Sequence, residues 1–297
     1  MIFKVIKDME DNKIDYSIII PHHNTPDLLK RCLDSIPDDR RIQVIVVDDN
    51  SNPEIVNFPE LQNHGRTNTT VVLTKEGRGA GYARNVGLSL AKGEWLVFSD
   101  SDDFFEPNLL KTLDQYKESK SEMILFKARS VDSETLEPAN RNENINKRID
   151  EALNGVITSR EASLLVHSPW CRMVKRSFVE EHQIRYDEVM CENDTMFTTK
   201  CSCLAKRIEV SPHVLYVCTY RKGSLWDARK TNPENYLTRV KVQINRNKYV
   251  SQFGYEQLPI IGFVIRAWSV GPKTFFRALG ITLYRKALFQ GIGHYFK

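Results

Sequence analysis

The sequence predicts an α/β fold, a Rossmann-like and mostly parallel sheet flanked by helices. Two observations support this. Short apolar runs rich in β-branched residues alternate with segments of helical periodicity, and each of four such runs ends in a cluster of polar residues. Strands that are apolar throughout are typical of parallel sheets covered by helices on both faces. Because such sheets bind ligands at the carboxyl ends of their strands, the polar clusters indicate where a site would lie.

The first two expected strands each end in polar residues. Residues 16–20 form the first strand, which ends in Pro-His-His-Asn at 21–24. Thr25 and Pro26 then suit the N-cap and the first position of a helix. Residues 42–47 form the second strand and lead directly into Asp-Asp-Asn-Ser.

The third and fourth expected strands introduce a glycine-rich turn and a carboxylate cluster. Residues 70–73 lead into the glycine-rich stretch 77–85 and a helix that extends to about Lys92. Residues 94–99 form the fourth strand, which is followed by Asp-Ser-Asp-Asp at 100–103. Like charges this close cannot all remain ionised unaided, and Mg²⁺ or Mn²⁺ with oxygen ligands would relieve them. The alternative is an acidic loop that caps the next helix.

The four motifs in this order resemble the nucleotide-diphosphosugar-binding half of glycosyltransferase family two, whose fold is called GT-A. They read Ile-Ile-Pro-x-x-Asn, Val-Val-Asp-Asp-Asn-Ser, Gly-x-Gly-x-Ala-Arg-Asn and Ser-Asp-Ser-Asp-Asp. The resemblance covers residues 16–110 and extends more weakly to about residue 224. One such motif alone would be weak, but four in order are specific.

The resemblance implies roles for three residues at the nucleoside. Pro21 and His23 stand where the family holds the nucleoside, although the family more often has Tyr at the position of His23. Imidazole can still stack or donate a hydrogen bond. Asp49 matches the acid that accepts a hydrogen bond from the uracil ring, a task that suits an acceptor-only carboxylate.

Three further residues would serve the diphosphate and the metal. Arg84 would contact the base or the diphosphate through its planar fork of donors, or else be a charge on a helix surface. Asp100 and Asp102 form the Asp-x-Asp pair. The resemblance implies that Asp102 binds the metal directly, that Asp100 reaches the ribose or the metal through water, and that Asp103 supports them.

An acidic motif in the second half of the chain would supply the catalytic base. Residues 191–197 read Cys-Glu-Asn-Asp-Thr-Met-Phe and resemble the family's Glu-Asp-x-x-Phe, with Asn193 in place of the Glu. An inverting transfer needs a carboxylate to remove the proton of the acceptor hydroxyl. We expect Asp194 to be this base, with Glu192 as the second candidate. Alternatively, Asp194 caps the helix that follows.

The last recognisable stretch, residues 216–224, resembles a Tyr-x-x-Arg-x-x-Ser segment that related enzymes place near the diphosphate. Arg221 and Lys222 would then screen the charge of the leaving group. They could equally be turn charges on a hairpin.

Composition and spacing exclude several classes of protein. A net charge of +4 is too mild to indicate nucleic-acid binding. The glycines do not match the dinucleotide fingerprint, and the Walker lysine motif is absent. Six scattered cysteines favour reduced thiols and a cytoplasmic protein.

We expect a catalytic domain over residues 1–225, with a nucleotide-sugar half at 15–110 and an acceptor half at 111–225. The polar stretch 132–150 reads as a mobile loop near the acceptor. Residues 226–297 would form a helical, basic and amphipathic extension.

The extension has an unusual composition. No apolar run reaches the ~20 residues that span a bilayer. After Glu256 there is no acid, while six Lys and Arg residues alternate with aromatic and aliphatic ones. This pattern fits either an interfacial helix on the anionic inner face of the cell membrane or an ordinary helix packed on the domain.

The sequence therefore predicts a metal-dependent, inverting glycosyltransferase that uses a UDP-sugar. By resemblance and from the basic extension, its acceptor would be a saccharide, expected to be lipid-linked, in surface polysaccharide biosynthesis. Two alternatives are a sugar-phosphate nucleotidyltransferase and a non-catalytic module that docks at membranes or partners. The first should carry a glycine-rich start after the first strand, which residues 20–24 lack, and intact carboxylates argue against the second.

Overall fold

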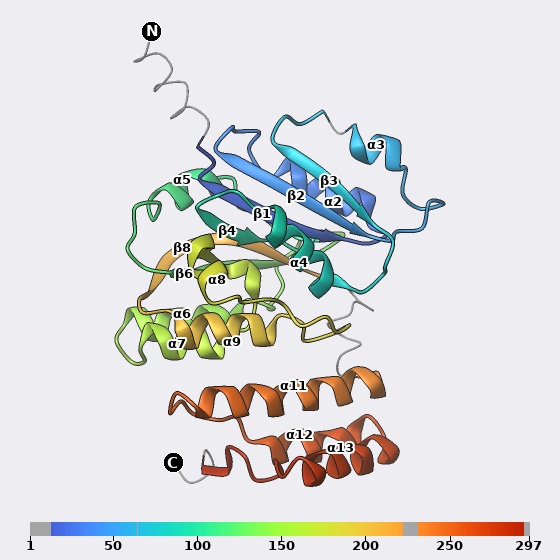
Figure 1. The fold of residues 1–297 in the computed structure, drawn as a ribbon, viewed down its shortest axis with the longest axis vertical. Coiled ribbons are helices and arrows are strands. Elements are labelled where there is room, and N and C mark those ends of the chain that lie inside the picture. The colour runs from blue at the N-terminus through green and yellow to red at the C-terminus, as the bar shows by residue number, and fades with distance from the viewer. Residues whose placement is uncertain (1–12, 64, 222–230, 294–297) are drawn as a thin grey trace.

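The computed structural model describes residues 13–63, 65–221 and 231–293. Its strands form one mixed sheet in the order β3-β2-β1-β4-β7-β6-β8-β5 (Figure 1). The four expected strands are confirmed as parallel neighbours: β1 (Tyr16–His22), β2 (Ile42–Asp49), β3 (Thr69–Thr74) and β4 (Trp95–Phe98).

The second half of the sheet is mixed in direction. The short strand β7 (Arg172–Lys175) runs antiparallel to β4 and to β6 (Met123–Asp132). Strand β8 (Ile208–Tyr220) is parallel to β6, and β5 (Phe104–Phe105) is antiparallel to β8. Arg221 follows directly after the end of β8, and the alternative of a hairpin at Arg221 and Lys222 extends outside the described residues.

The alternating directions of the side chains explain the uninterrupted apolar runs. In β4, Trp95 and Val97 pack into one core cluster, while Leu96 and Phe98 pack into the cluster on the opposite face. Successive residues of a strand point to opposite faces, so a strand covered on both faces must be apolar at every position.

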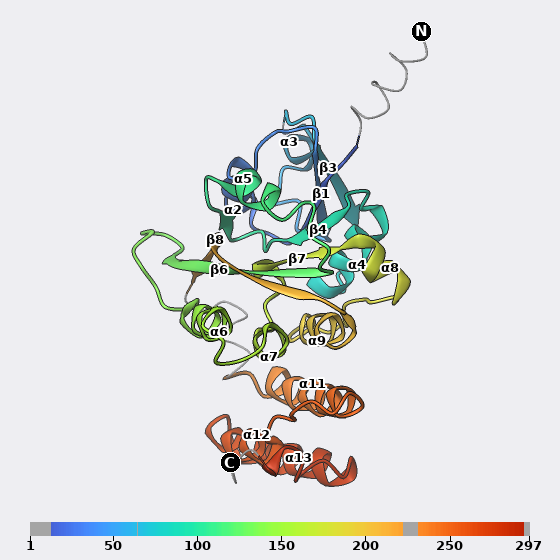
Figure 2. The same cartoon turned by 90° about the vertical axis from the view of Figure 1, so that its left-hand side faces the viewer.

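Helices cover both faces of the sheet (Figures 1 and 2). Around its N-terminal half lie α2 (Pro26–Asp34), α3 (Phe58–Gln62), α4 (Ala80–Leu90), α5 (Leu109–Asp114) and α8 (Arg176–Glu181). Next to β6 and β8 lie α6 (Glu143–Leu153), α7 (Ser159–Leu165), the 3-10 turn η1 (Pro169–Cys171) and α9 (Thr195–Leu204). Residues 133–142 connect β6 to α6, but the expected loop does not extend to residue 150, because Ile145 and Ile149 bury one face of α6 against the core.

The C-terminal helices pack mainly on one another. They are α11 (Pro233–Ser251), α12 (Ile260–Arg266), the turn η2 (Ala267–Ser269) and α13 (Pro272–Tyr284), and they share a separate apolar cluster. Figures 1 and 2 show that α11 lies between α12 and α13 on one side and the layer that contains α7 and α9 on the other. No helix among the described residues has both the length and the hydropathy needed to cross a bilayer. The boundary expected at 225/226 lies outside the described residues.

Candidate active site

The polar clusters that follow β1, β2 and β4 meet at one edge of the sheet, because these strands are parallel neighbours. The amide of Asn24, after β1, donates to the Ser51 hydroxyl after β2 at 2.8 Å. Thr25 Oγ1 lies 3.3 Å from Ser101 Oγ after β4. Thr25 occupies the N-cap of α2 as expected, but its side chain makes no capping bond. The sequence thus predicted correctly which clusters gather at this edge.

The residues expected at the nucleoside lie together. Pro21 is buried within β1, and the exposed His23 points its Nδ1 to within 3.1 Å of the Asp49 carbonyl oxygen. The Asp49 carboxylate accepts from Thr74 Oγ1 at 3.0 Å and from the Gly79 amide at 2.5 Å. A carboxylate has about four acceptor positions, so Asp49 can still accept from a base while both bonds fix its orientation.

His22, to which the sequence assigned no role, stabilises the residues that follow β1 and β2. It is buried, and its Nδ1 lies 2.7 Å from the carboxylate of Asp48, which also accepts from the amide and hydroxyl of Ser51. Burial alone would raise the pKa of Asp48, but the hydrogen bonds from His22 and Ser51 outweigh it and lower this pKa. The alternation of a strand could have revealed the inward direction of His22 next to the outward His23.

The carboxylates after β4 form a compact group. One oxygen each of Asp100, Asp102 and Asp103 lies within 4.8 Å of the others. Burial and the charge of Asp100 raise the pKa of Asp102, whereas burial and both neighbouring charges raise the pKa of Asp103 well above its usual value. A hard divalent cation would relieve this repulsion, and three carboxylate oxygens suit Mn²⁺ or Mg²⁺.

The three acids have different partners. Asp103 is buried and accepts from the Tyr216 hydroxyl at 3.0 Å, from the Thr219 amide at 2.6 Å and from Thr219 Oγ1 at 3.1 Å. Asp102 keeps 31% of its side chain exposed, and its carboxylate lies 4.0 Å from the guanidinium of Arg221. These surroundings fit Asp102 as a metal ligand and Asp103 as its anchor.

Arg84 connects the carboxylate group to the acidic motif. It donates to Asp100 at 2.5 Å and to Asn193 Oδ1 at 2.8 Å, and its guanidinium lies 5.3 Å from the ring centre of Tyr186. Only 5% of the residue is exposed, so the alternative of a helix-surface charge is wrong. A contact between Arg84 and the base or the diphosphate stays a prediction.

Glycine permits this connection. A Cβ atom at Gly81 would lie 2.2 Å from the Asp187 carbonyl oxygen and 3.0 Å from the Asn193 Cβ, so only glycine lets α4 approach the acidic motif this closely. Gly79, at the N-cap of α4, has a φ of 88° that also favours glycine. The sequence located the glycine-rich turn but not its packing partner.

The two candidate bases differ in their surroundings. Asp194 stands at the N-cap of α9, yet its side chain makes no capping hydrogen bond. Burial and the charge of Glu192 raise the pKa of Asp194 to about 6, although Arg84 opposes them. Glu192 instead lies 3.3 Å from Arg239 Nε and accepts from Thr195 Oγ1 at 3.2 Å. Its φ of 57° is a strained conformation for this residue type.

Tyr216 is a second residue whose role the sequence did not reveal. Its hydroxyl accepts from the Asp100 amide at 2.9 Å and donates to Asp103, and its ring stacks on Trp170 with centroids 4.8 Å apart. Tyr216 therefore fixes the backbone between two of the carboxylates. Arg221 follows Tyr216 by five residues, and Lys222 lies outside the described residues.

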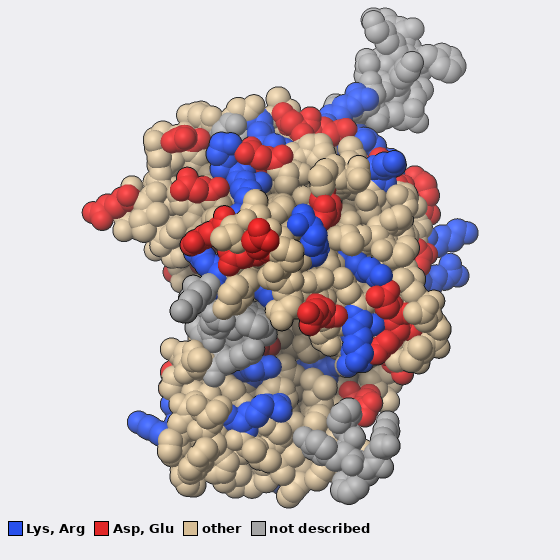
Figure 3. Space-filling model, turned by 180° about the vertical axis from the view of Figure 1, so that it is seen from behind, with Lys and Arg blue, Asp and Glu red and all other residues tan. Residues whose placement is uncertain are grey.

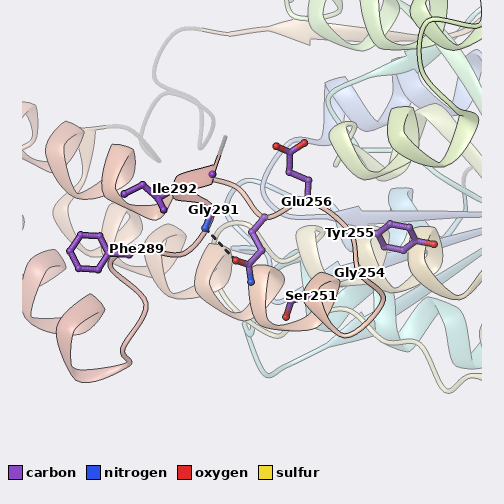
Figure 4. Close-up of a pocket in the computed structure, with 9 residues that line it drawn as sticks. Ser251, Gly254, Tyr255, Glu256, Phe289, Gly291 and Ile292 are labelled. Carbon is purple, nitrogen blue, oxygen red and sulfur yellow. Dashed lines mark hydrogen bonds between the residues drawn. The ribbon is translucent and has the colours of Figure 1, made fainter. Parts of the chain in front are cut away.

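A hollow elsewhere on the chain is separate from this site. It lies in the C-terminal bundle between the end of α11 and residues 289–293, and is lined by Ser251, Tyr255 and Phe289 among others (Figure 4). It has no residue in common with the clusters at the strand ends.

A mixed sheet with polar clusters after β1 and β2 and an Asp-x-Asp pair after β4 is the arrangement of the GT-A fold. The family model described as "Glycosyl transferase family 2" matches residues 17–183, which is more than half of the chain. The chain therefore belongs to glycosyl transferase family 2.

Two curated relatives are poly(ribitol-phosphate) glycosyltransferases. The chain is 26% identical over 228 residues to poly(ribitol-phosphate) beta-glucosyltransferase of Bacillus spizizenii, which covers 74% of this chain and 34% of the relative. It is 25% identical over 228 residues to poly(ribitol-phosphate) beta-N-acetylglucosaminyltransferase TarS of Staphylococcus aureus, covering 74% and 38%. The chain thus spans little more than a third of the length of these relatives.

Solved structures agree on the fold. Residues 1–349 of S. aureus TarS in complex with UDP-GlcNAc give a TM-score of 0.64 at 21% identity, covering 90% of this chain and 80% of that one. Mannosyltransferase PcManGT from Pyrobaculum calidifontis, in complex with GDP-Man and Mn²⁺, gives 0.57 at 18% identity, covering 92% and 76%.

Proposed function

We propose that this enzyme is a metal-dependent, inverting glycosyltransferase that moves a sugar from a UDP-sugar to a hydroxyl of a cell-surface polysaccharide or its lipid-linked precursor. The observation that carries the proposal is the arrangement around Arg84. This one side chain binds both the Asp-x-Asp pair and the acidic motif, so the proposed donor end and the proposed base lie on either side of it.

The donor would occupy the edge after β1, β2 and β4. Pro21 and His23 would border the nucleoside, and Asp49 would accept from the uracil N–H. A neighbouring fold was solved with UDP-GlcNAc, which supports this class of donor. UDP is a proposal for this chain, because another neighbour was solved with GDP-Man.

Asp102 and Asp100 would hold the metal, whose charge would stabilise the departing diphosphate. Arg221 lies near Asp102 and would add a second positive charge there. Asp194 would take the proton of the acceptor hydroxyl as the oxygen attacks the anomeric carbon. A carboxylate with a pKa of about 6 is mostly ionised at neutral pH and still accepts a proton better than an ordinary aspartate.

Glu192 fits a supporting role better than that of the base. Its pairing with Arg239 and its bond from Thr195 occupy the carboxylate, while Asp194 makes no capping bond. We therefore assign the proton transfer to Asp194, and we assign to Glu192 a structural role in holding the acidic motif.

A screen of nucleotide sugars tests the proposal. The purified chain should release a nucleoside diphosphate from at least one donor when Mn²⁺ is present, and a chelator should stop the release. Release that is unchanged by the chelator would remove the metal from the mechanism. The Asp102→Ala variant is the matched control for the metal, because its fold should survive while release stops.

We also propose that the C-terminal bundle contacts the anionic face of a membrane. Phe276, Leu283 and Tyr284 lie on one side of α13 at helical spacing and are between 56% and 90% exposed, and Trp268 and Phe289 are similarly exposed. In Figure 3 the lower part of the molecule, where these helices lie, is mostly uncharged with scattered Lys and Arg. Aromatic residues beside basic ones suit anionic lipid, and the sequence after Glu256 contains no acid.

Vesicle sedimentation tests this contact with point variants, because deleting α13 would remove Ala278 and Thr282 from the interior of the bundle. The double variant Phe276→Ser and Tyr284→Ser should lose binding to vesicles that contain phosphatidylserine, and high salt should weaken binding of the unmodified chain. Val156→Ser, at an exposed apolar residue between α6 and α7, is the control and should bind normally. Equal binding of both variants would contradict the proposal.

A further inference from the structure

A layer of polar side chains lies between α11 and the helices that cover the sheet. Arg239, Gln243 and Arg246 recur on α11 at helical spacing and so lie on one side of it. Arg246 is 2% exposed and uses only one nitrogen, donating from Nη2 to the Leu164 carbonyl at 2.9 Å. Its Nε and Nη1 have no hydrogen-bond partner among the described residues. The layer therefore contains a buried cation with free donors.

A neutral histidine and a second buried arginine lie at the same turn of chain. His167 Nε2 shares the Leu164 carbonyl with Arg246, at 3.1 Å. Arg172 is fully buried and donates to the carbonyl oxygens of Val166 and Ser168. Burial and the charges of Arg246, Arg172 and Arg239 lower the pKa of His167 to about 3, which indicates that these groups act on one another.

Negative charge in this layer is scarce. Glu192 pairs with Arg239, and α9 contains no acid. Glu161, the acid of α7, closes the capping box with Thr158. Within the described chain, neither Arg172 nor Arg246 forms an ion pair. A buried guanidinium without a counter-charge is costly, so an anion in this layer would stabilise it.

We propose that these residues form a subsite that binds a phosphate group of the acceptor. The proposal rests on the proposed function, because it places the subsite beside the base: Arg239 is partly exposed and contacts Glu192, two residues from Asp194. A guanidinium fork matches phosphate oxygens. The buried Thr199 hydroxyl, a further donor, also has no partner among the described residues.

Thermal unfolding with inorganic phosphate as the probe tests the subsite, in chelator and without nucleotide. Phosphate should raise the Tm of the unmodified chain above that in chloride at equal ionic strength. Arg246→Met should abolish this shift, while Lys248→Gln, at an exposed position on the same helix, should keep it. Arg221→Gln should also keep it, which separates this site from the diphosphate site. A shift that survives Arg246→Met, or no shift at all, would overturn the proposal. If Arg246→Met fails to fold, Arg246→Gln takes its place with the same outcomes.

Acceptor kinetics distinguish the sources of the anion. With a phosphodiester-linked polyol oligomer, Arg246→Met should raise the acceptor KM by about tenfold or more, which is the scale of one charged hydrogen bond, and leave donor hydrolysis unchanged. A neutral oligosaccharide should show no such effect. The same rise with a uronate oligosaccharide alone would replace phosphate by carboxylate and contradict the proposal. If no donor is hydrolysed at all, the proposed function fails, while the phosphate shift still tests the subsite by itself.

Discussion

Replacing Asp194 with Asn should remove activity and increase stability together. A base contributes ~10²–10⁴-fold to the rate, so turnover should fall by about 100-fold or more while the affinity for the donor stays nearly intact. In the unmodified enzyme, activity should rise with pH through about 6, because only the ionised carboxylate accepts a proton. This rise should be absent in Asp194→Asn.

The stability change follows from the same pKa. Folding raises the pKa of Asp194 from 3.8 to about 6, so the folded state disfavours the ionised form. This loss of folding stability is absent below about pH 3.8, where the carboxyl group is protonated in both the folded and the unfolded state. It is fully present above about pH 6. About two units at ~1.36 kcal/mol each give an upper limit of about 3 kcal/mol, which partial exposure reduces to about 1–2 kcal/mol. Asp194→Asn should therefore be more stable than the unmodified enzyme at pH 7.5.

Paired assays measure both effects: denaturant unfolding at pH 7.5, and turnover between pH 5 and 8. Asp187→Asn is the matched control, because burial also raises the pKa of this nearby acid and we assign it no role in the reaction. It should keep its turnover. A loss of stability in Asp194→Asn, with turnover reduced only in proportion, would refute the assignment and make Asp194 a structural residue.

Three further predictions concern the carboxylate group. Asp102→Ala should nearly abolish turnover and Mn²⁺-dependent nucleotide binding by calorimetry, and binding that is equal with and without Mn²⁺ would contradict its role. Arg84→Met should lower the free energy of unfolding by about 2–3 kcal/mol. This is less than the roughly 3–5 kcal/mol lost when a wholly buried ion pair is broken, because a third of the Asp100 side chain is exposed. A change under about 1 kcal/mol would contradict this prediction. Tyr216→Phe should cost about 1–3 kcal/mol in the same measurement, since it removes the partner of Asp103, and an unchanged midpoint would argue against that bond.

The N-terminal half of the site could be predicted from local sequence. A strand that is apolar at every position and ends in polar residues has few other interpretations, so four strands and the meeting of their polar ends followed from pattern alone. Contacts between distant segments could not be found in this way. The bonds from Arg84 to Asn193 and from Tyr216 to Asp103 join residues more than 100 positions apart, and nothing near either residue in the sequence specifies its partner.

The second half of the chain shows what tertiary packing adds. Residues 132–150 are polar enough to suggest a loop, yet Ile145 and Ile149 lie four apart and are sufficient to bury one side of α6. The C-terminal segment fitted both a packed and a membrane-facing helix. The structure buries Ala278 and Thr282 of α13 and exposes Phe276 and Tyr284. One side of the helix therefore packs in the bundle, and the other is free for the proposed membrane contact.

The most direct test of the central claim is the anomeric configuration of the first sugar product, followed by NMR during donor hydrolysis with Mn²⁺ and before mutarotation. A single displacement, with Asp194 deprotonating the attacking water, predicts that an α-linked nucleotide sugar first yields the β-anomer. The early appearance of the α-anomer would contradict the account, because it would require retention and a covalent or front-face mechanism.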